Sequence, residues 1–188
     1  SHDNSASGTD LNFTNHYDVV TVPVAKSWSD DNNRDNKRPS SITVNLFADG
    51  TKVASQKITE ANGWKYEFKD LPKYNNGTEI KYTITEDAVE GYTSSINGFN
   101  ITNTYTPEKV QVSGSKNWND DGNAAGTRPG SITIRLYANG SEIAHKTVTE
   151  KDGWSWNWTG LNRYDTDHKE ISYTISEDAV DGYTSSVS

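Results

Sequence analysis

Residues 22–50 read VPVAKSWSDDNNRDNKRPSSITVNLFADG, and residues 112–140 read VSGSKNWNDDGNAAGTRPGSITIRLYANG. The two stretches align without a gap at an offset of 90 residues. Further along, YTITEDAVEGYTSS at 82–95 matches YTISEDAVDGYTSS at 173–186 after a one-residue insertion. Self-similarity over this length indicates one structural unit that occurs twice. The sequence therefore predicts two tandem domains.

Each repeat has the pattern of an all-β domain. Asp49-Gly50 and Asn139-Gly140 are typical of tight hairpin turns, and no stretch shows a helical period. Short segments rich in β-branched and aromatic residues alternate between apolar and polar positions; in the first repeat they are 41–48, 52–59, 64–69, 79–86 and 99–105. We therefore predict two β-sandwiches of about seven strands each. A short linker near Pro107 predicts that they follow one another in a rod-like arrangement.

The repeats are out of phase with the ends of the chain. LNFTNHY, at residues 11–17, matches FNITNTY at residues 99–105, so Asn15 corresponds to Asn103. The predicted divisions are the last strand of a preceding repeat at 1–17, a complete first repeat at 18–106, and a second repeat without its last strand at 107–188.

Composition narrows the class of partner. The chain has 188 residues and a net charge of −8 with no basic block, which argues against nucleic acid or an anionic membrane surface as partner. No apolar run approaches the roughly 20 residues that would insert in a bilayer. Cysteine is absent and the four histidines are scattered, so we predict no disulfide, no metal site and no cofactor.

Three polar residues lie in line with apolar strand faces. Side chains two residues apart on a strand share a face. The alternating rows are Val20, Val22, Val24, Lys26 and Trp28; Ile80, Tyr82, Ile84 and Glu86; and Phe99, Ile101, Asn103 and Tyr105. A buried polar group without a partner costs roughly 1–3 kcal/mol, so three of them in one small domain are expected to partner one another.

A lysine, a glutamate and an asparagine in one apolar pocket can form a covalent bond. The neutral lysine amine attacks the side-chain carboxamide, ammonia leaves, and an isopeptide bond remains. A protonated carboxylic acid can polarise the carbonyl and carry the proton to the leaving ammonia. Rigid strands supply effective molarities on the order of 10⁵ M or more. The alternative is three separate structural roles, in which Lys26 reaches solvent, Glu86 lies at the rim and Asn103 caps a turn.

The second repeat has the same lysine and glutamate in phase but not the asparagine. Lys116 and Glu177 have no Asn partner of their own, and Asn15 has no Lys or Glu of its own. Donation of residues 11–17 to another molecule would unite them, giving head-to-tail self-association in which Glu177 is the catalytic acid. The alternative is that residues 1–17 form a loosely docked tail and the second repeat exposes a sheet edge.

The motifs in combination resemble a known family. Lys-x-Trp, Arg-Pro-x-Ser-Ile, Tyr-Thr-Ile-x-Glu and Thr-Asn-Thr-Tyr, in this order, are similar to the B-type repeat of Gram-positive collagen-adhesin-like surface proteins, over nearly the whole chain. The resemblance implies a prealbumin-like, immunoglobulin-like β-sandwich with a Lys–Asn isopeptide bond and a catalytic Glu. By position it assigns these roles to Lys26, Asn103 and Glu86, and in the second repeat it assigns Lys116 and Glu177 only.

The resemblance also implies where such a chain works. It implies an extracellular stalk on the wall of a Gram-positive cell, with neighbouring repeats of the same protein as partners. The wall anchor and the ligand of a parent protein are not in this sequence.

Two further features bear on function. Trp64, Tyr66 and Phe68 alternate, as do Trp154, Trp156 and Trp158; such rows are more often core than a sugar-stacking face. The acidic loop 30–38 is better explained as a solvated loop than as a cation site, because its counterpart loses several oxygen ligands. We therefore expect a structural module without turnover. The alternative is a carbohydrate- or protein-binding module of a surface adhesin.

Overall fold

The computed structural model of the chain describes residues 16–188. Packing divides the chain into two compact units, one with the residues up to Ser27 and Pro39–Asn103, the other with Trp28–Arg38 and Thr104–Ser188. The units follow the two sequence repeats except at the loop Trp28–Arg38, which belongs to the first repeat by sequence.

Regular structure in the described residues is almost entirely strand, which confirms the all-β prediction. Within residues 16–188, helical turns are limited to two three-residue 3₁₀ segments, η1 (Glu60–Asn62) and η2 (Glu150–Asp152). No helix in the described part of the chain has the length and apolar character needed to cross a bilayer.

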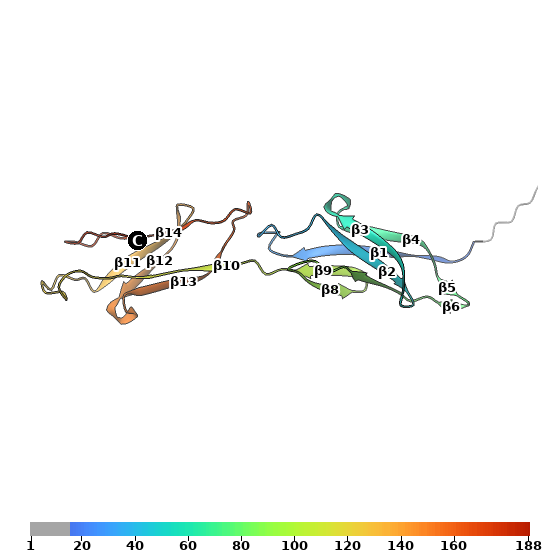
Figure 1. Cartoon of the computed structure of the whole chain (residues 1–188), viewed down its shortest axis with the longest axis horizontal. Coiled ribbons are helices and arrows are strands. Elements are labelled where there is room, and N and C mark those ends of the chain that lie inside the picture. The colour runs from blue at the N-terminus through green and yellow to red at the C-terminus, as the bar shows by residue number, and fades with distance from the viewer. Residues whose placement is uncertain (1–15) are drawn as a thin grey trace, which may run out of the picture. The chain divides into compact units, whose positions relative to one another are not determined.

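The first repeat is a two-layer sandwich. Its strands are β1 (Val19–Ser29), β2 (Ser41–Ala48), β3 (Thr51–Thr59), β4 (Lys65–Pro72), β5 (Tyr74–Asn75), β6 (Thr78–Glu79), β7 (Tyr82–Glu86), β8 (Thr93–Asn97) and β9 (Asn100–Thr104). One sheet has the order β4-β1-β9-β8 and the other β3-β2-β7, with β5-β6 as a small separate hairpin (Figure 1). Val22 and Val24 of β1 and Val44 and Leu46 of β2 are buried, as the period of two predicts.

The last strand of the first repeat lies beside its first strand. The Ala25 N–H donates to the Phe99 carbonyl at 3.2 Å, and the Tyr105 N–H donates to the Ser29 carbonyl at 2.9 Å. The pairing advances in the same direction along both strands, as in a parallel ladder. Strands at opposite ends of the repeat in sequence are therefore neighbours in space.

Hairpin turns form at the predicted positions. Asp49 and Gly50 have φ values of 48° and 83°, and Asn139 and Gly140 have the same two values. A two-residue turn with both φ values positive matches the twist of the flanking strands, which is why Asp-Gly and Asn-Gly are found there.

Each repeat contains a clamp between an aspartate and an arginine. Arg38 donates to both oxygens of Asp30, at 3.0 and 2.7 Å, and its guanidinium lies 5.3 Å from the centre of the Trp28 ring. Arg128 and Asp120 repeat the contact over Trp118. Asp30 is buried, so the expectation of a fully solvated loop at 30–38 is wrong at this residue. The bidentate pair fixes the loop that follows the first strand.

The second repeat forms the same two layers with fewer strands. They are β10 (Lys109–Ser115), β11 (Ser131–Ala138), β12 (Ser141–Thr149), β13 (Ser155–Asn162) and β14 (Tyr173–Glu177). Their sheets are β10-β13 and β12-β11-β14. Trp156 and Trp158 are buried in the core and Trp154 packs against it, so this aromatic row is interior, as predicted.

One core position differs between the repeats in a complementary way. Val24 faces Tyr66 across β1 and β4, whereas Gly114 faces Trp156 across β10 and β13. A Cβ atom on Gly114 would lie 2.6 Å from a ring carbon of Trp156. The larger indole is accommodated because its neighbour has no side chain.

Candidate functional site

Three strands bring Lys26, Glu86 and Asn103 together in the first repeat. Glu86, the last residue of β7, is paired with Val44 of β2, whose side chain is fully buried. Directly opposed residues of an antiparallel pair point to the same face, so Glu86 faces the core. Lys26 on β1 and Asn103 on β9 come from adjacent strands of the facing sheet.

The three side chains meet at one carboxylate oxygen. Lys26 Nζ lies 2.7 Å from Glu86 Oε1. Asn103 Nδ2 donates to the same oxygen at 3.2 Å. The amine and the carboxamide are thus both within hydrogen-bonding distance of a single atom, as the in-phase positions predict.

The site excludes water. The Lys26 and Glu86 side chains are 0% and 1% exposed, and Asn103 is fully buried. Burial lowers the pKa of the Lys26 amine below its usual 10.5, although the hydrogen bond and the charge of Glu86 act in the opposite direction. Lowering this pKa favours the neutral amine, the form that can act as a nucleophile.

The carboxamide orientation differs in one respect from the sequence-based prediction. Polarising the carbonyl requires a donor on Asn103 Oδ1, but Glu86 contacts the amide nitrogen, the atom that would leave as ammonia. Asn103 Oδ1 and Glu86 Oε2 are buried without a hydrogen-bond partner among the described residues. Because a carboxamide has nearly the same shape after a half-turn about Cβ–Cγ, the same carboxyl group can serve either atom.

The second repeat has the lysine and the glutamate in contact. Lys116 Nζ lies 2.9 Å from each carboxylate oxygen of Glu177, which is paired with the buried Ile134 across β11 and β14. The lysine and the glutamate that lie in phase in the sequence are therefore in contact in the structure. Asn15, the predicted partner of Lys116, lies outside the described residues.

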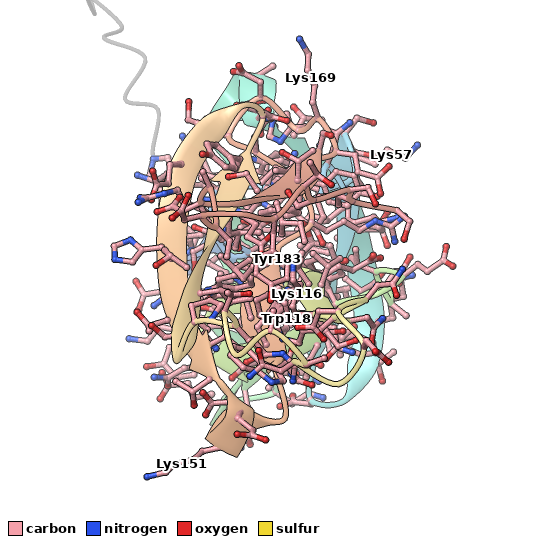
Figure 2. All side chains as sticks on the ribbon, turned by 90° about the vertical axis from the view of Figure 1, so that its left-hand side faces the viewer. Lys57, Lys116, Trp118, Lys151, Lys169 and Tyr183 are labelled. Atoms are coloured by element: carbon pink, nitrogen blue, oxygen red, sulfur yellow. The ribbon has the colours of Figure 1, made fainter. Side chains whose placement is uncertain are left out.

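Two aromatic residues beside Lys116 were not assigned a role from the sequence. The Lys116 amine lies 4.8 Å from the centre of the Trp118 ring, and that ring packs edge-to-face against Tyr183 at 5.1 Å. Figure 2 shows the three side chains near the middle of one face of the second unit. The sequence contained a signal for Trp118, because the Lys-x-Trp motif places it two residues after Lys116 and residues two apart share a strand face.

The described residues contain no group of three or more histidine, aspartate or glutamate side chains placed to hold a metal ion.

Comparisons with known proteins point to one family. The model of the Cna protein B-type domain matches residues 22–104 and 112–188. The collagen adhesin of Staphylococcus aureus is 43% identical over 189 residues, which cover 98% of this chain and 16% of that protein. This chain therefore spans a small part of the length of that relative.

Solved structures of related repeats are also similar. A single B repeat unit of the collagen-binding surface protein of Staphylococcus aureus is 42% identical, with a TM-score of 0.47, and the match covers 89% of this chain and 90% of that one. A structure of two B repeat units of the same protein is 42% identical, with a TM-score of 0.48, and covers 89% and 45%. Because the family match extends over both repeats and the adhesin is 43% identical across nearly the whole chain, the chain belongs to the Cna protein B-type domain family.

Proposed function

We propose that this chain is a structural spacer module of a bacterial surface adhesin, and that its first repeat locks itself with an amide bond between Lys26 and Asn103. The observation that carries the proposal is the buried cluster in which Lys26 and Asn103 both contact Glu86 Oε1. Glu86 is the catalytic acid of a reaction that occurs once per molecule, so the module is not an enzyme with turnover.

The reaction balances without a cofactor. Lys26 passes a proton to Glu86, and its neutral Nζ attacks Cγ of Asn103. The new N–C bond forms, the bond from Cγ to Nδ2 breaks, and Nδ2 leaves as ammonia with protons relayed by Glu86. The dry pocket supports this sequence because separated charges are costly there, and the two reactants are already held by one oxygen.

The bond joins the strands that would carry load. The chain enters the first repeat through β1 and leaves it through β9. With Lys26 joined to Asn103, tension passes from β1 through the new bond into β9 and bypasses the residues between them. The sandwich then cannot be unravelled by pulling on its ends, which suits a spacer under mechanical stress and hinders proteolysis of the opened chain.

The cellular setting rests on the relatives. The 43% identical protein is named a collagen adhesin, and the matched region is a small part of it. We therefore propose an extracellular location, anchored to the cell wall of a Gram-positive bacterium through other parts of a parent protein, with neighbouring repeats as partners. The rod-like arrangement of the two repeats remains a prediction from the short linker. The described tryptophan row lies in the core, so no observation favours a sugar-binding function.

Intact mass spectrometry tests the bond. In an Asn15→Ala background, where only the first repeat has all three groups, the chain should weigh less than its sequence mass by one ammonia. Lys26→Met and Glu86→Gln should each restore the full mass, and peptide mapping of the parent should join Lys26 to Asn103. A parent chain at full sequence mass would show that the proposed reaction does not occur.

A further inference from the structure

Four asparagines of this chain are each followed by a glycine, the context in which an asparagine side chain most readily loses its amide. They are Asn62, Asn76, Asn97 and Asn139. Glycine favours the reaction because it has no side chain to shield its own backbone nitrogen. All four asparagines are exposed and lie in a turn or next to one. Exposure therefore does not distinguish the four sites, and the local hydrogen bonds must.

The reaction joins the asparagine to its own neighbour in the chain. The glycine nitrogen gives its proton to hydroxide and forms a bond to the asparagine Cγ. The bond from Cγ to Nδ2 breaks, and Nδ2 takes a proton from water and leaves as ammonia. Water then opens the cyclic imide at one of its two carbonyl carbons, which gives either aspartate or isoaspartate. The attack thus needs a free glycine N–H and a carboxamide that can turn toward it.

Hydrogen bonds hold two of the four side chains in place. Asn62 Oδ1 accepts from the Thr59 N–H at 2.9 Å. Asn139 Oδ1 accepts from the Ser172 N–H, also at 2.9 Å. The N–H of the glycine after Asn62 is engaged as well, because it donates to the Glu60 carbonyl at 2.8 Å. These bonds must break before either carboxamide can meet the nitrogen that would attack it.

The two repeats show that these turns use only a side-chain oxygen. Asp49 has the position equivalent to Asn139, and its Oδ1 accepts from the Lys81 N–H at the same distance of 2.9 Å. Asp152 has the position equivalent to Asn62 and likewise accepts from a main-chain N–H at 2.9 Å. The tether is therefore a property of the turn, whether the turn contains asparagine or aspartate.

Asn76 has neither form of protection. Among residues 16–188, no hydrogen bond reaches the carboxamide of Asn76, and no backbone hydrogen bond uses the N–H of Gly77. The turn closes the separate hairpin of β5 and β6, whose strands have two residues each (Figure 1). A two-stranded hairpin is marginal in water, so opening it locally costs little.

Asn97 has no side-chain hydrogen bond among the described residues either, but a larger sheet holds its turn. It is the last residue of β8, and the turn that follows leads into β9. β9 lies between β1 and β8, and its Ile101 is fully buried. Turning Asn97 toward its neighbour disturbs the edge of a four-stranded sheet, whereas turning Asn76 disturbs only one small hairpin.

We propose that Asn76 is the site at which this chain deamidates first, by cyclisation with Gly77. The rate in the folded chain falls from Asn76 to Asn97, and it is lowest at the tethered Asn62 and Asn139. Deamidation adds a negative charge to the hairpin, and isoaspartate also adds a main-chain carbon to a two-residue turn. The buried lysine–glutamate–asparagine cluster takes no part, so this proposal is independent of the proposed function.

Peptide mapping of folded chain aged in heavy-oxygen water at mildly alkaline pH measures the four rates in one sample. Each conversion incorporates one heavy oxygen, and digestion in ordinary water afterwards separates conversion in the folded chain from conversion during digestion. Trypsin separates the sites, since Asn62, Asn76, Asn97 and Asn139 fall in the peptides 58–65, 74–81, 82–109 and 136–146.

The isolated tryptic peptides supply the reference rates. Without the fold, all four asparagines are free to turn and should react at comparable rates. In the folded chain, Asn76 should react at nearly its peptide rate. Asn62 and Asn139 should be slowed about fivefold or more, the effect of one hydrogen bond that has to break. An Asn76 that is slowed as much as Asn139 would overturn the proposal.

The variant Asp49→Asn tests the tether separately from the shape of the turn. Residues 49 and 50 have φ values of 48° and 83°, close to the 49° and 79° at residues 76 and 77. The Lys81 N–H remains in place to hold the new side chain. The new site should deamidate about fivefold or more slowly than Asn76 in the same sample. Equal rates would overturn the proposal, because the shape of the turn alone would then set them.

Hydrogen exchange over β2 and β3 shows whether this variant keeps its fold. If exchange there is faster than in the parent chain, the order of the four rates in the parent decides the proposal by itself.

The products show whether the reaction passes through the cyclic imide. Ring opening gives both aspartate and isoaspartate in the peptide 74–81, and chromatography separates these two products of equal mass. Asn76→Asp provides the aspartate reference. Aspartate without isoaspartate would mean direct hydrolysis of the side chain and would overturn the cyclisation with Gly77.

Discussion

Glu86→Gln should stop the first repeat from locking while leaving both reactants in place. The glutamine is nearly isosteric but cannot relay protons. We expect the ammonia deficit to disappear and the free energy of unfolding of the first repeat to fall. The matched control is Glu177→Gln in the second repeat, which breaks the same kind of lysine–glutamate contact without a local asparagine. Both changes are made in the Asn15→Ala background.

The magnitude follows from the loop that the bond closes. A bond between Lys26 and Asn103 closes a loop of about 78 residues. In the chain-entropy model used for disulfides, closing a loop of this length stabilises the fold by about 4.5 kcal/mol. In the variant, the unreacted Lys26 amine also stays buried without its carboxylate, which adds a cost like that of a broken buried ion pair, roughly 3–5 kcal/mol. The Glu177→Gln control measures only the free-energy cost of breaking a lysine–glutamate contact. Because Glu86 is more deeply buried than Glu177, the loss in the first repeat should exceed that in the second by at least the closure contribution.

Hydrogen exchange resolved by peptide mass spectrometry measures the two losses separately. Peptides over β2 and β3 report on the first repeat, and peptides over β11 and β12 report on the second. A difference of about 4.5 kcal/mol corresponds to roughly a thousandfold faster exchange in the first repeat. Equal losses in the two repeats would refute the reasoning, because the bond would then contribute nothing beyond the ion pair.

Three further predictions concern packing and pH. Gly114→Val should destabilise the second repeat by about 1–3 kcal/mol through its clash with Trp156; adding Trp156→Tyr, which recreates the first-repeat pairing, should recover most of the loss in a urea titration. The Arg128 guanidinium lowers the pKa of Asp120 from 3.8 to about 2. The stability that this contact contributes is therefore complete above about pH 4 and is lost as the pH falls through about 2. Asp120→Asn should flatten the acid unfolding curve in that pH window, and an unchanged curve would contradict the assignment. Burial lowers the pKa of the Lys26 amine. When chain that was purified unfolded is refolded, it should therefore lose ammonia faster as the pH rises, and the rate should level off below pH 10.5. A rate that levels off only at pH 10.5 would show that burial has no effect on the pKa of this amine.

Local patterns in the sequence predicted much of the fold. The offset between the repeats defines two domains, the alternation at Val22, Val24 and Lys26 defines the buried face of β1, and Asp49-Gly50 defines a hairpin. These features depend on residues close in the chain, where strand periodicity and turn geometry leave few choices. The same alternation put Lys26, Glu86 and Asn103 in line with apolar faces.

Other features depend on contacts between distant residues. Lys26 and Asn103 contact the same oxygen of Glu86. This arrangement requires β1 to pair with β9, and it requires β7 to face both strands from the other sheet. The orientation of the Asn103 carboxamide and the Asp30–Arg38 clamp have no local sequence signal, because hydrogen-bond partners are chosen after the layers have packed.

By itself, then, the sequence determined the repeat, the strand faces and which polar residues lie in line with them, because these follow from spacing along the chain. Only the tertiary structure decided that Lys26 is covered and Lys116 partly open. Burial depends on whether another strand lies over the site, and that is a property of packing in three dimensions.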